Sequence, residues 1–189
     1  MCVVFKQDPT HYVNCRYTAG DRLFRHNECV RIIADGVRDL SGHARVEPRK
    51  LNDNNGDRPD IDFTVGVHRV LLDFTCRNDV SRSQIGRESV LQYAERRKVQ
   101  HYSDMAKAVH AQLSVFMMRA FGGFCKSSLD LVEVLRRHGV PRDSLCSSKL
   151  VLHQLCQRLS VMVHRANGNA YIKGVAKSVS PLVLGAGAV

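Results

Sequence analysis

Residues 58–76 alternate apolar and polar side chains on both sides of a Gly66-Val67 pair. Strict alternation predicts β-strands with one buried face. A glycine in the first of two central positions is typical of a type II′ hairpin turn. The segment therefore predicts a hairpin of two strands over residues 61–65 and 69–76, and no other part of the chain constrains the fold as tightly.

The register of this hairpin brings two carboxylates together. With Gly66-Val67 as the turn, Val65 pairs with His68, and Asp60 lies opposite Asp73. Opposed residues share a face of the sheet, with Cβ atoms about 4.5–5.5 Å apart. A one-residue slip would move carboxylates into the core. In the predicted register one face is entirely apolar, formed by Ile61, Phe63, Val65, Val70, Leu72 and Phe74. The other face carries Asp60, Asp62, Thr64, Arg69, Asp73 and Thr75, with Leu71 the one apolar exception.

Two carboxylates this close repel, and each raises the pKa of the other unless a cation lies between them. Oxygen ligands with incomplete coordination by the protein favour Mg²⁺, or Mn²⁺ in its place. Asp60 and Asp73 are therefore candidate ligands of a divalent metal. From spacing alone the alternative is open that both are solvent-facing acids, screened by Arg58 and Arg69.

A lysine on the next predicted element bears on this choice. Residues 88–106 predict a helix, and Lys98 lies in the middle of its inward-facing stripe, formed by Leu91, Ala94, Lys98, Tyr102 and Met105. A lysine in such a stripe needs a partner, which a buried carboxylate pair supplies. The alternative is that Lys98 continues the exposed run of Arg96 and Arg97, with its stem lying along the surface.

The remaining elements follow from helical spacing and from turn residues. We expect helices over residues 22–40, 129–138 and 147–166, and strands over 44–51 and 113–121. Pro48 interrupts the first of these strands, which is therefore expected to lie at a sheet edge or to contain a bulge. The last helix is expected to begin at a serine cap and to end at Asn167-Gly168. The order α-β-β-β-α-β-α-α predicts an α/β fold, a small mixed β-sheet core flanked by helices.

Length and composition define the organisation of the chain. Its 189 residues, 44% hydrophobic and 24% charged, suit one ordinary domain over residues 22–179. We expect an N-terminal extension over 1–21, a connection between strands over 51–57 and a loose tail over 180–189. No apolar run approaches 18 residues, so no membrane span is expected. Seven cysteines without a framework indicate free thiols in a reducing, intracellular compartment.

The charge of the chain favours a polyanionic partner. The formal net charge is +10, and nucleic acid is the commonest partner of such a protein. Residues 136–189 carry eight Lys and Arg against one acid. Candidate contacts to a DNA backbone in this stretch are Arg158, Arg165, Lys173 and Lys177. The alternative is a solvated helix face.

Together these residues resemble the PD-(D/E)XK nuclease superfamily, in the variant found as the restriction-like endonuclease of site-specific non-LTR retrotransposons. The resemblance covers roughly residues 8–174. Its motifs are Arg25-His26-Asn27 opening the first helix, Arg58-Pro59-Asp60, then Asp73-Phe74-Thr75 after twelve intervening residues, and Lys98 before Tyr102. The late segment 165–170 is similar to the end of that family's C-terminal helix.

The resemblance implies a restriction-endonuclease-like fold and a Mg²⁺-dependent DNA endonuclease in which Asp60 and Asp73 hold the metal, with the Phe74 carbonyl as a further ligand. Thr75 stands where the superfamily has lysine, and Lys98 matches the place of the helical lysine that substitutes for it in this variant. Cleavage would leave a 3′-hydroxyl that primes reverse transcription in the parent elements. That implies a nuclear protein associated with DNA and, within a larger element, with a reverse transcriptase or element RNA.

Other residues are weaker candidates. Accessory roles near the metal are open to Tyr102, Thr75, Arg25, His26 and Glu28. No Cys-x2-Cys pair is present, so the N-terminal set is expected to be the remnant of a zinc knuckle rather than a Zn²⁺ site; that set is Cys2, His11, Cys15, His26 and Cys29. No small-molecule cofactor is expected. Two further hypotheses are a decayed nuclease that only binds nucleic acid and a small zinc-stabilised binding protein without catalysis.

Overall fold

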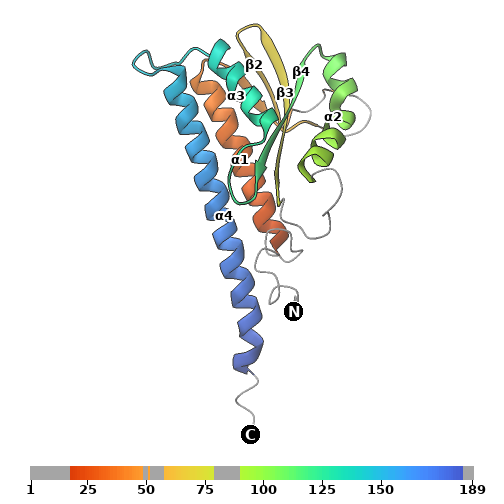
Figure 1. The fold of residues 1–189 in the computed structure, drawn as a ribbon, viewed down its shortest axis with the longest axis vertical. Coiled ribbons are helices and arrows are strands. Elements are labelled where there is room, and N and C mark those ends of the chain that lie inside the picture. The colour runs from red at the N-terminus through yellow and green to blue at the C-terminus, as the bar shows by residue number, and fades with distance from the viewer. Residues whose placement is uncertain (1–17, 49–50, 52–57, 79–89, 185–189) are drawn as a thin grey trace.

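Four strands form one mixed sheet in the order β1-β2-β3-β4 (Figure 1). Their bounds are His43–Val46 for β1, Ile61–Val65 for β2, His68–Arg77 for β3 and Gln112–Arg119 for β4. The computed structural model describes residues 18–48, 51, 58–78 and 90–184, of which 90 and 177–184 are described as backbone only. The predicted connection over 51–57, apart from Leu51, and residues 1–17 of the predicted extension over 1–21 lie outside the described residues. Residues 19–21 of that extension belong instead to the first helix, Ala19–Asp39.

Four described helices accompany the sheet: α1 is Ala19–Asp39, α2 is Val90–Ala108, α3 is Lys126–His138 and α4 is Ser148–Leu184. The order of elements along the chain matches the predicted α-β-β-β-α-β-α-α. The α/β class with a small mixed sheet is therefore confirmed.

The predicted hairpin register is also confirmed. Val65 pairs with His68 and Ile61 pairs with Leu72 across antiparallel β2 and β3. Gly66 has a φ of +57°, which a glycine adopts without steric cost. The turn and the apolar face favour the same register, because slipping by one residue would expose the whole apolar set.

The sheet has two different edges. β1 pairs antiparallel with β2, and it ends at Val46, before Glu47 at positive φ and Pro48. It is an edge strand, which is one of the two expected arrangements, and it is shorter than the expected residues 44–51. At the other edge β4 runs parallel to β3, and α2 forms the crossover that a parallel pair requires.

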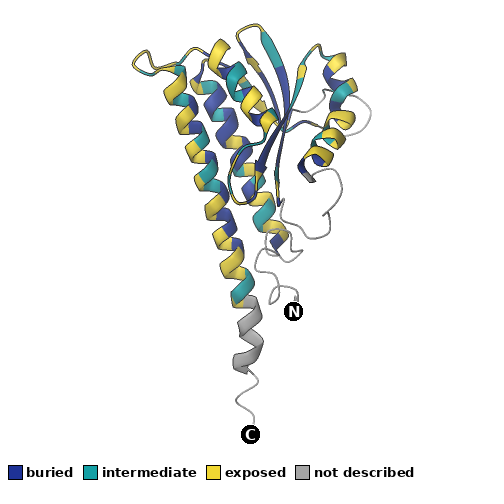
Figure 2. Cartoon of the chain, in the orientation of Figure 1, coloured by how far each residue is buried: buried dark blue, intermediate teal, exposed yellow. Residues whose placement is uncertain are grey.

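The sheet lies between two layers of helices (Figure 1). Its predicted apolar face packs against α1, α3 and α4 in the main core, in which Ile33, Leu72, Phe116 and Leu155 are fully or almost fully buried. The opposite face is covered by α2, where Leu71 contacts Tyr102, Met105 and Ala106. In Figure 2 the central strands are mostly buried and the outer side of α4 is exposed. The hairpin therefore has helices on both faces, and α2 covers the face that carries the carboxylates.

The expected end of the last helix at Asn167-Gly168 is wrong, because α4 continues to Leu184. Ser147 does cap its start, since the Leu150 N–H donates to Ser147 Oγ at 3.2 Å. Asn167 is buried and bonds to neighbouring elements instead of ending the helix. The helix also includes residues 180–184, which the sequence assigned to a loose tail.

The described cysteines agree with the expectation of free thiols. Cys29, Cys76, Cys125, Cys146 and Cys156 are all unbridged, and burial raises the pKa of Cys29 to about 12. None of the described helices has both the length and the apolar composition that crossing a membrane demands.

Candidate functional site

Asp60 lies where the β2–β3 ladder ends. The last backbone pair is Ile61 with Leu72, and beyond it Asp60 Oδ2 accepts a hydrogen bond from the Phe74 N–H at 2.6 Å. The Asp60 carboxylate thus accepts the hydrogen bond that a backbone carbonyl of β2 would accept if the ladder continued. Because the N–H and C=O of a strand residue point to the same side, the Phe74 carbonyl points to the same side of β3 as this N–H.

Asp73 projects from β3 and is 2% exposed. Its Oδ1 accepts a hydrogen bond from Lys98 Nζ at 2.8 Å, whereas no described residue donates to its buried Oδ2. Burial raises the pKa of Asp73, the charge of Asp60 raises this pKa further, and Lys98 opposes both. Asp73 is therefore a buried acid with one oxygen uncompensated by the residues described.

Lys98 comes from the inward face of α2, as the stripe predicted. Leu91, Ala94, Tyr102 and Met105 are buried on this face. The Lys98 side chain is 34% exposed, and its ammonium ends on Asp73 and 5.7 Å from the centre of the Tyr102 ring. The alternative of a solvated lysine continuing the Arg96-Arg97 run is therefore wrong, because the ammonium of Lys98 is bound at the sheet.

Tyr102 helps to position the segment before Asp60. Its ring is buried one turn after Lys98, and its hydroxyl donates to the Arg58 carbonyl at 3.0 Å. This bond ties α2 to the segment that leads into β2. Tyr102 therefore supports the site through the segment that leads into β2.

His26 reaches the site from α1, on the other side of the sheet. Its Nε2 lies 3.0 Å from Asp60 Oδ1, and its ring lies 5.7 Å from the ring of Phe74. The hydrogen bond to Asp60 raises the pKa of His26 above its ordinary value, and the charge of Asp73 acts in the same direction. His26 and the Phe74 N–H together hold the Asp60 carboxylate in one orientation.

The other accessory candidates do not contact the carboxylates. The buried guanidinium of Arg25 donates to Asn167 Oδ1, and Asn167 Nδ2 donates to the Ala120 carbonyl, which ties α1 to α4 and to the residue after β4. Glu28 forms an ion pair with Arg31 on the same helix. Thr75 is buried on the same face of β3 as Asp73.

Asp60 and Asp73 suit a magnesium ion that is bound mainly by oxygen atoms. Among the described residues no group of three or more His, Cys, Asp or Glu side chains is arranged to hold a metal. Mg²⁺ does not require one, because it commonly binds one or two carboxylates and keeps several waters. The uncompensated Oδ2 of Asp73 and the neighbouring Asp60 carboxylate are hard oxygen donors. The donor set therefore fits Mg²⁺ or Mn²⁺.

The predicted zinc ligands fall into two groups. Cys2, His11 and Cys15 lie outside the described residues. His26 is bound to Asp60, and Cys29 is fully buried in the core of α1. Neither described residue is thus available to a zinc site in this arrangement.

The predicted DNA contacts all lie on α4. Arg165 is exposed, Arg158 lies 3.8 Å from Asp35, and Lys173 lies 2.5 Å from Asp21. Two of these three cations are therefore partly compensated by acids of α1. The side chain of Lys177 lies outside what the structure describes.

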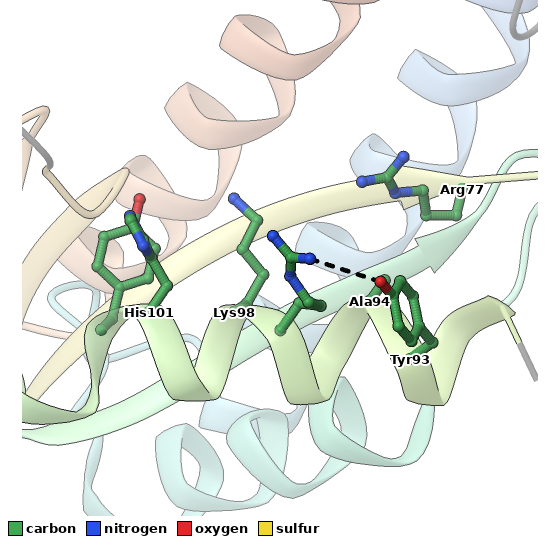
Figure 3. A pocket seen from close by; sticks show the side chains of 7 residues that line it. Arg77, Tyr93, Ala94, Lys98 and His101 are labelled. Carbon is green, nitrogen blue, oxygen red and sulfur yellow. Dashed lines mark hydrogen bonds between the residues drawn. The ribbon is translucent and has the colours of Figure 1, made fainter. Parts of the chain in front are cut away.

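Sequence reasoning missed a basic cavity beside Lys98. Arg77 and residues of α2 line a cavity of about 410 Å³, and Figure 3 shows Lys98 extending from α2 toward β3. Tyr93, Arg97 and His101 recur at intervals of four along the helix, parallel to the stripe that contains Lys98. That spacing could have revealed the second stripe, but the contribution of Arg77 from β3 could not be read from it.

Comparison with known proteins finds no match for this sequence, either among protein-family models or among curated proteins.

Proposed function

We propose that this protein is a metal-dependent DNA endonuclease that hydrolyses phosphodiester bonds at Asp60, Asp73 and Lys98. The observation that carries the proposal is the buried Asp73 carboxylate, with one oxygen bound to Lys98 and the other without a described donor. An acid in this state beside a second carboxylate favours a bound cation. A cation and a lysine beside it are what phosphodiester hydrolysis needs, because negative charge develops on the phosphate.

Each residue has a distinct part in the proposed reaction. Asp60, Asp73 and the Phe74 carbonyl would hold Mg²⁺, which when bound supplies positive charge to the phosphate and lowers the pKa of a water. Lys98 orients the attacking water through its ammonium and stabilises the charge that develops on phosphate oxygens. His26 holds Asp60 in place through Oδ1. Tyr102 positions the chain before Asp60.

The architecture supports the same proposal at the level of fold. A helix, three antiparallel strands, a crossover helix and a parallel fourth strand form the α-β-β-β-α-β core that the resemblance to the PD-(D/E)XK superfamily implies. We take the fold to be restriction-endonuclease-like on this basis. The proposed partner is DNA, and the proposed setting is the nucleus, with a reverse transcriptase or element RNA as a further partner in a larger element.

Nicking of supercoiled plasmid with and without Mg²⁺ tests the proposal. Asp60→Ala and Asp73→Ala remove metal ligands, so cleavage should be abolished at any practical Mg²⁺ concentration. Lys98→Ala should leave a residual rate, lower by roughly 10²- to 10³-fold, the usual effect of one preorganised group. Lys107→Ala is the matched control, because Lys107 is an exposed lysine on the same helix.

A companion variant tests the position that departs from the superfamily. Thr75→Lys restores the commoner lysine, and combined with Lys98→Ala it should recover part of the lost rate. Wild-type nicking by both aspartate variants would falsify the proposal. Wild-type protein that binds DNA but does not cut it with Mg²⁺ or Mn²⁺ would favour the alternative, a decayed nuclease that serves as a basic binding module.

A further inference from the structure

The basic cavity beside the carboxylate pair has the composition of a ligand site. It holds about 410 Å³, within the range of roughly 300–1,000 Å³ typical of small-molecule sites. Its lining comes from two elements, β3 and one side of α2 (Figure 3). The lining residues are Arg77, Tyr93, Ala94, Arg97, Lys98, His101 and Tyr102.

The charges in this lining call for an anion. The lining contains no Asp or Glu, and two of its members are guanidinium groups, which stay charged at any physiological pH. Within the described part of the chain, neither Arg77 nor Arg97 forms an ion pair with a carboxylate. Lys98 differs, because Asp73 compensates its charge. The two arginines therefore leave positive charge directed at the cavity.

Aromatic rings accompany these charges. Tyr93 is 45% exposed and lines the cavity, with Arg97 3.5 Å from its hydroxyl and the Arg96 guanidinium 5.7 Å from its ring centre. His101 stands edge-on to Tyr102 at 4.6 Å between ring centres. Arginines alone can bind a phosphate group. An exposed aromatic ring beside them offers in addition a surface on which a base can stack. Guanidinium groups next to exposed aromatic faces are typical of sites for single-stranded nucleic acid.

The cavity adjoins the proposed catalytic centre at Lys98. Lys98 both lines the cavity and donates to Asp73, so a ligand in the cavity lies one side chain away from the carboxylates. In a duplex the bases are stacked inside the helix and cannot reach the ring of Tyr93. Only an unpaired nucleotide can present a base to that ring while its phosphate contacts Arg77 or Arg97.

The geometry points to a binding site for an unpaired nucleotide of single-stranded nucleic acid in this cavity, with Arg77 and Arg97 on its phosphates and Tyr93 against a base. This inference rests on the proposed function for the identity of the polyanion. It adds the form of the substrate, which is a strand that is unpaired beside the cleavage site.

The test measures binding without cleavage. Fluorescence anisotropy in a metal chelator compares a short labelled single strand with the duplex of the same sequence, using the full chain. Tyr93→Ala should weaken single-strand binding by roughly 5- to 150-fold and duplex binding far less. Arg97→Ala should lower the slope of log affinity against log salt for the single strand by roughly 0.7.

Two matched controls separate the cavity from general surface effects. Tyr171→Ala removes a similarly exposed tyrosine of α4, and Lys107→Ala removes an exposed cation of α2 outside the cavity. Both should retain single-strand affinity. Equal losses for single strand and duplex, no loss in Tyr93→Ala, or a wild-type protein that does not bind single strands would each overturn the inference. If the single-strand results hold but plasmid is never nicked, the binding site stands and the proposed catalysis falls.

Discussion

Asp73 is the residue through which a bound metal should most directly affect the stability of the fold. Its Oδ2 is buried without a described donor, and burial together with Asp60 raises its pKa. A cation bound there stabilises the folded chain by mass action, by about 2.7 kcal/mol at a hundredfold excess over Kd. We expect Mg²⁺ or Mn²⁺ to raise the Tm of chelator-treated wild-type protein and to leave the Tm of Asp73→Asn unchanged.

Thermal melts over a series of metal concentrations provide the measurement. Asp104→Asn is the control, because Asp104 is 95% exposed and should keep the wild-type shift. An equal shift in wild type and in Asp73→Asn would show that the ion is held elsewhere.

A second buried acid of the hairpin, Asp62, is held by arginines. Arg69 donates through Nε and Nη2 at 3.1 and 3.0 Å, and Arg45 donates to the same carboxylate. Burial acts to raise the pKa of Asp62, but the hydrogen bonds from the two arginines outweigh it, so this pKa lies below its ordinary value of 3.8. Asp62 is therefore ionised and compensated, in contrast to Asp73.

The lowered pKa of Asp62 gives stability a defined pH dependence. Because the folded pKa is lower than the unfolded one, the contribution of Asp62 is present above about pH 3.8 and is lost as the pH falls through the folded value. Asp62→Asn should cost roughly 1.5–3 kcal/mol at neutral pH and should flatten the acid limb of the stability curve. Urea unfolding at several pH values measures both effects, and a wild-type acid limb in Asp62→Asn would contradict them.

At the scale of elements, the packing of α4 decides which glycines matter. A Cβ added at Gly168 meets no atom within 4 Å, although this glycine lies inside the helix. Alanine is better than glycine in a helix interior by about 0.8–1.0 kcal/mol. Gly168→Ala should therefore stabilise the protein by up to this amount in chemical denaturation.

Gly36 of α1 provides the contrasting case. A Cβ there would lie 3.0 Å from both methyl groups of Leu155 on α4, and Leu155 is fully buried. Overpacking of this kind costs typically 1–3 kcal/mol, which offsets or exceeds the gain in helix propensity. Gly36→Ala should therefore be neutral or destabilising in the same denaturation experiment. A stabilisation equal to that of Gly168→Ala would show that the contact between α1 and α4 is loose.

The whole molecule carries a net charge of +10, and its affinity for DNA should depend steeply on salt. Each phosphate contacted adds a slope of about −0.9 to log affinity against log salt on duplex DNA. Arg165→Ala should reduce the magnitude of this slope by about 0.9, the contribution of one phosphate contact. Lys173→Ala should lower it less, because Lys173 is bound to Asp21 in the free protein.

Binding isotherms at several salt concentrations give these slopes. The triple variant of Arg158, Arg165 and Lys173 to alanine should lose affinity for all sequences alike, because backbone contacts position the duplex without reading its bases. A slope near zero in wild type, or unchanged binding by the triple variant, would remove α4 as the DNA-binding surface.

Local patterns in the sequence were sufficient to predict the hairpin and the inward position of Lys98. The alternation over 61–76 and the glycine of the turn act within a few residues, so the register from Ile61–Leu72 to Val65–His68 could be predicted. The ladder ends before Asp60 and Asp73, although the charge of Asp60 still raises the pKa of Asp73. The inward position of Lys98 followed from helical spacing for the same reason. Strand and helix periodicities depend only on neighbouring residues, so they can be recognised without knowing how the elements pack.

Only the tertiary structure decided the contacts between distant elements. Asn167-Gly168 reads locally as a helix end, but Asn167 bonds to Arg25 and to the Ala120 carbonyl, and the helix continues. His26 reaches Asp60 across 34 positions of sequence, and Arg77 joins the α2 stripe to form the cavity. A hydrogen bond or a cavity wall of this kind exists only once α1, α2 and α4 have packed on the sheet, because its energy depends on burial that no short stretch of sequence contains.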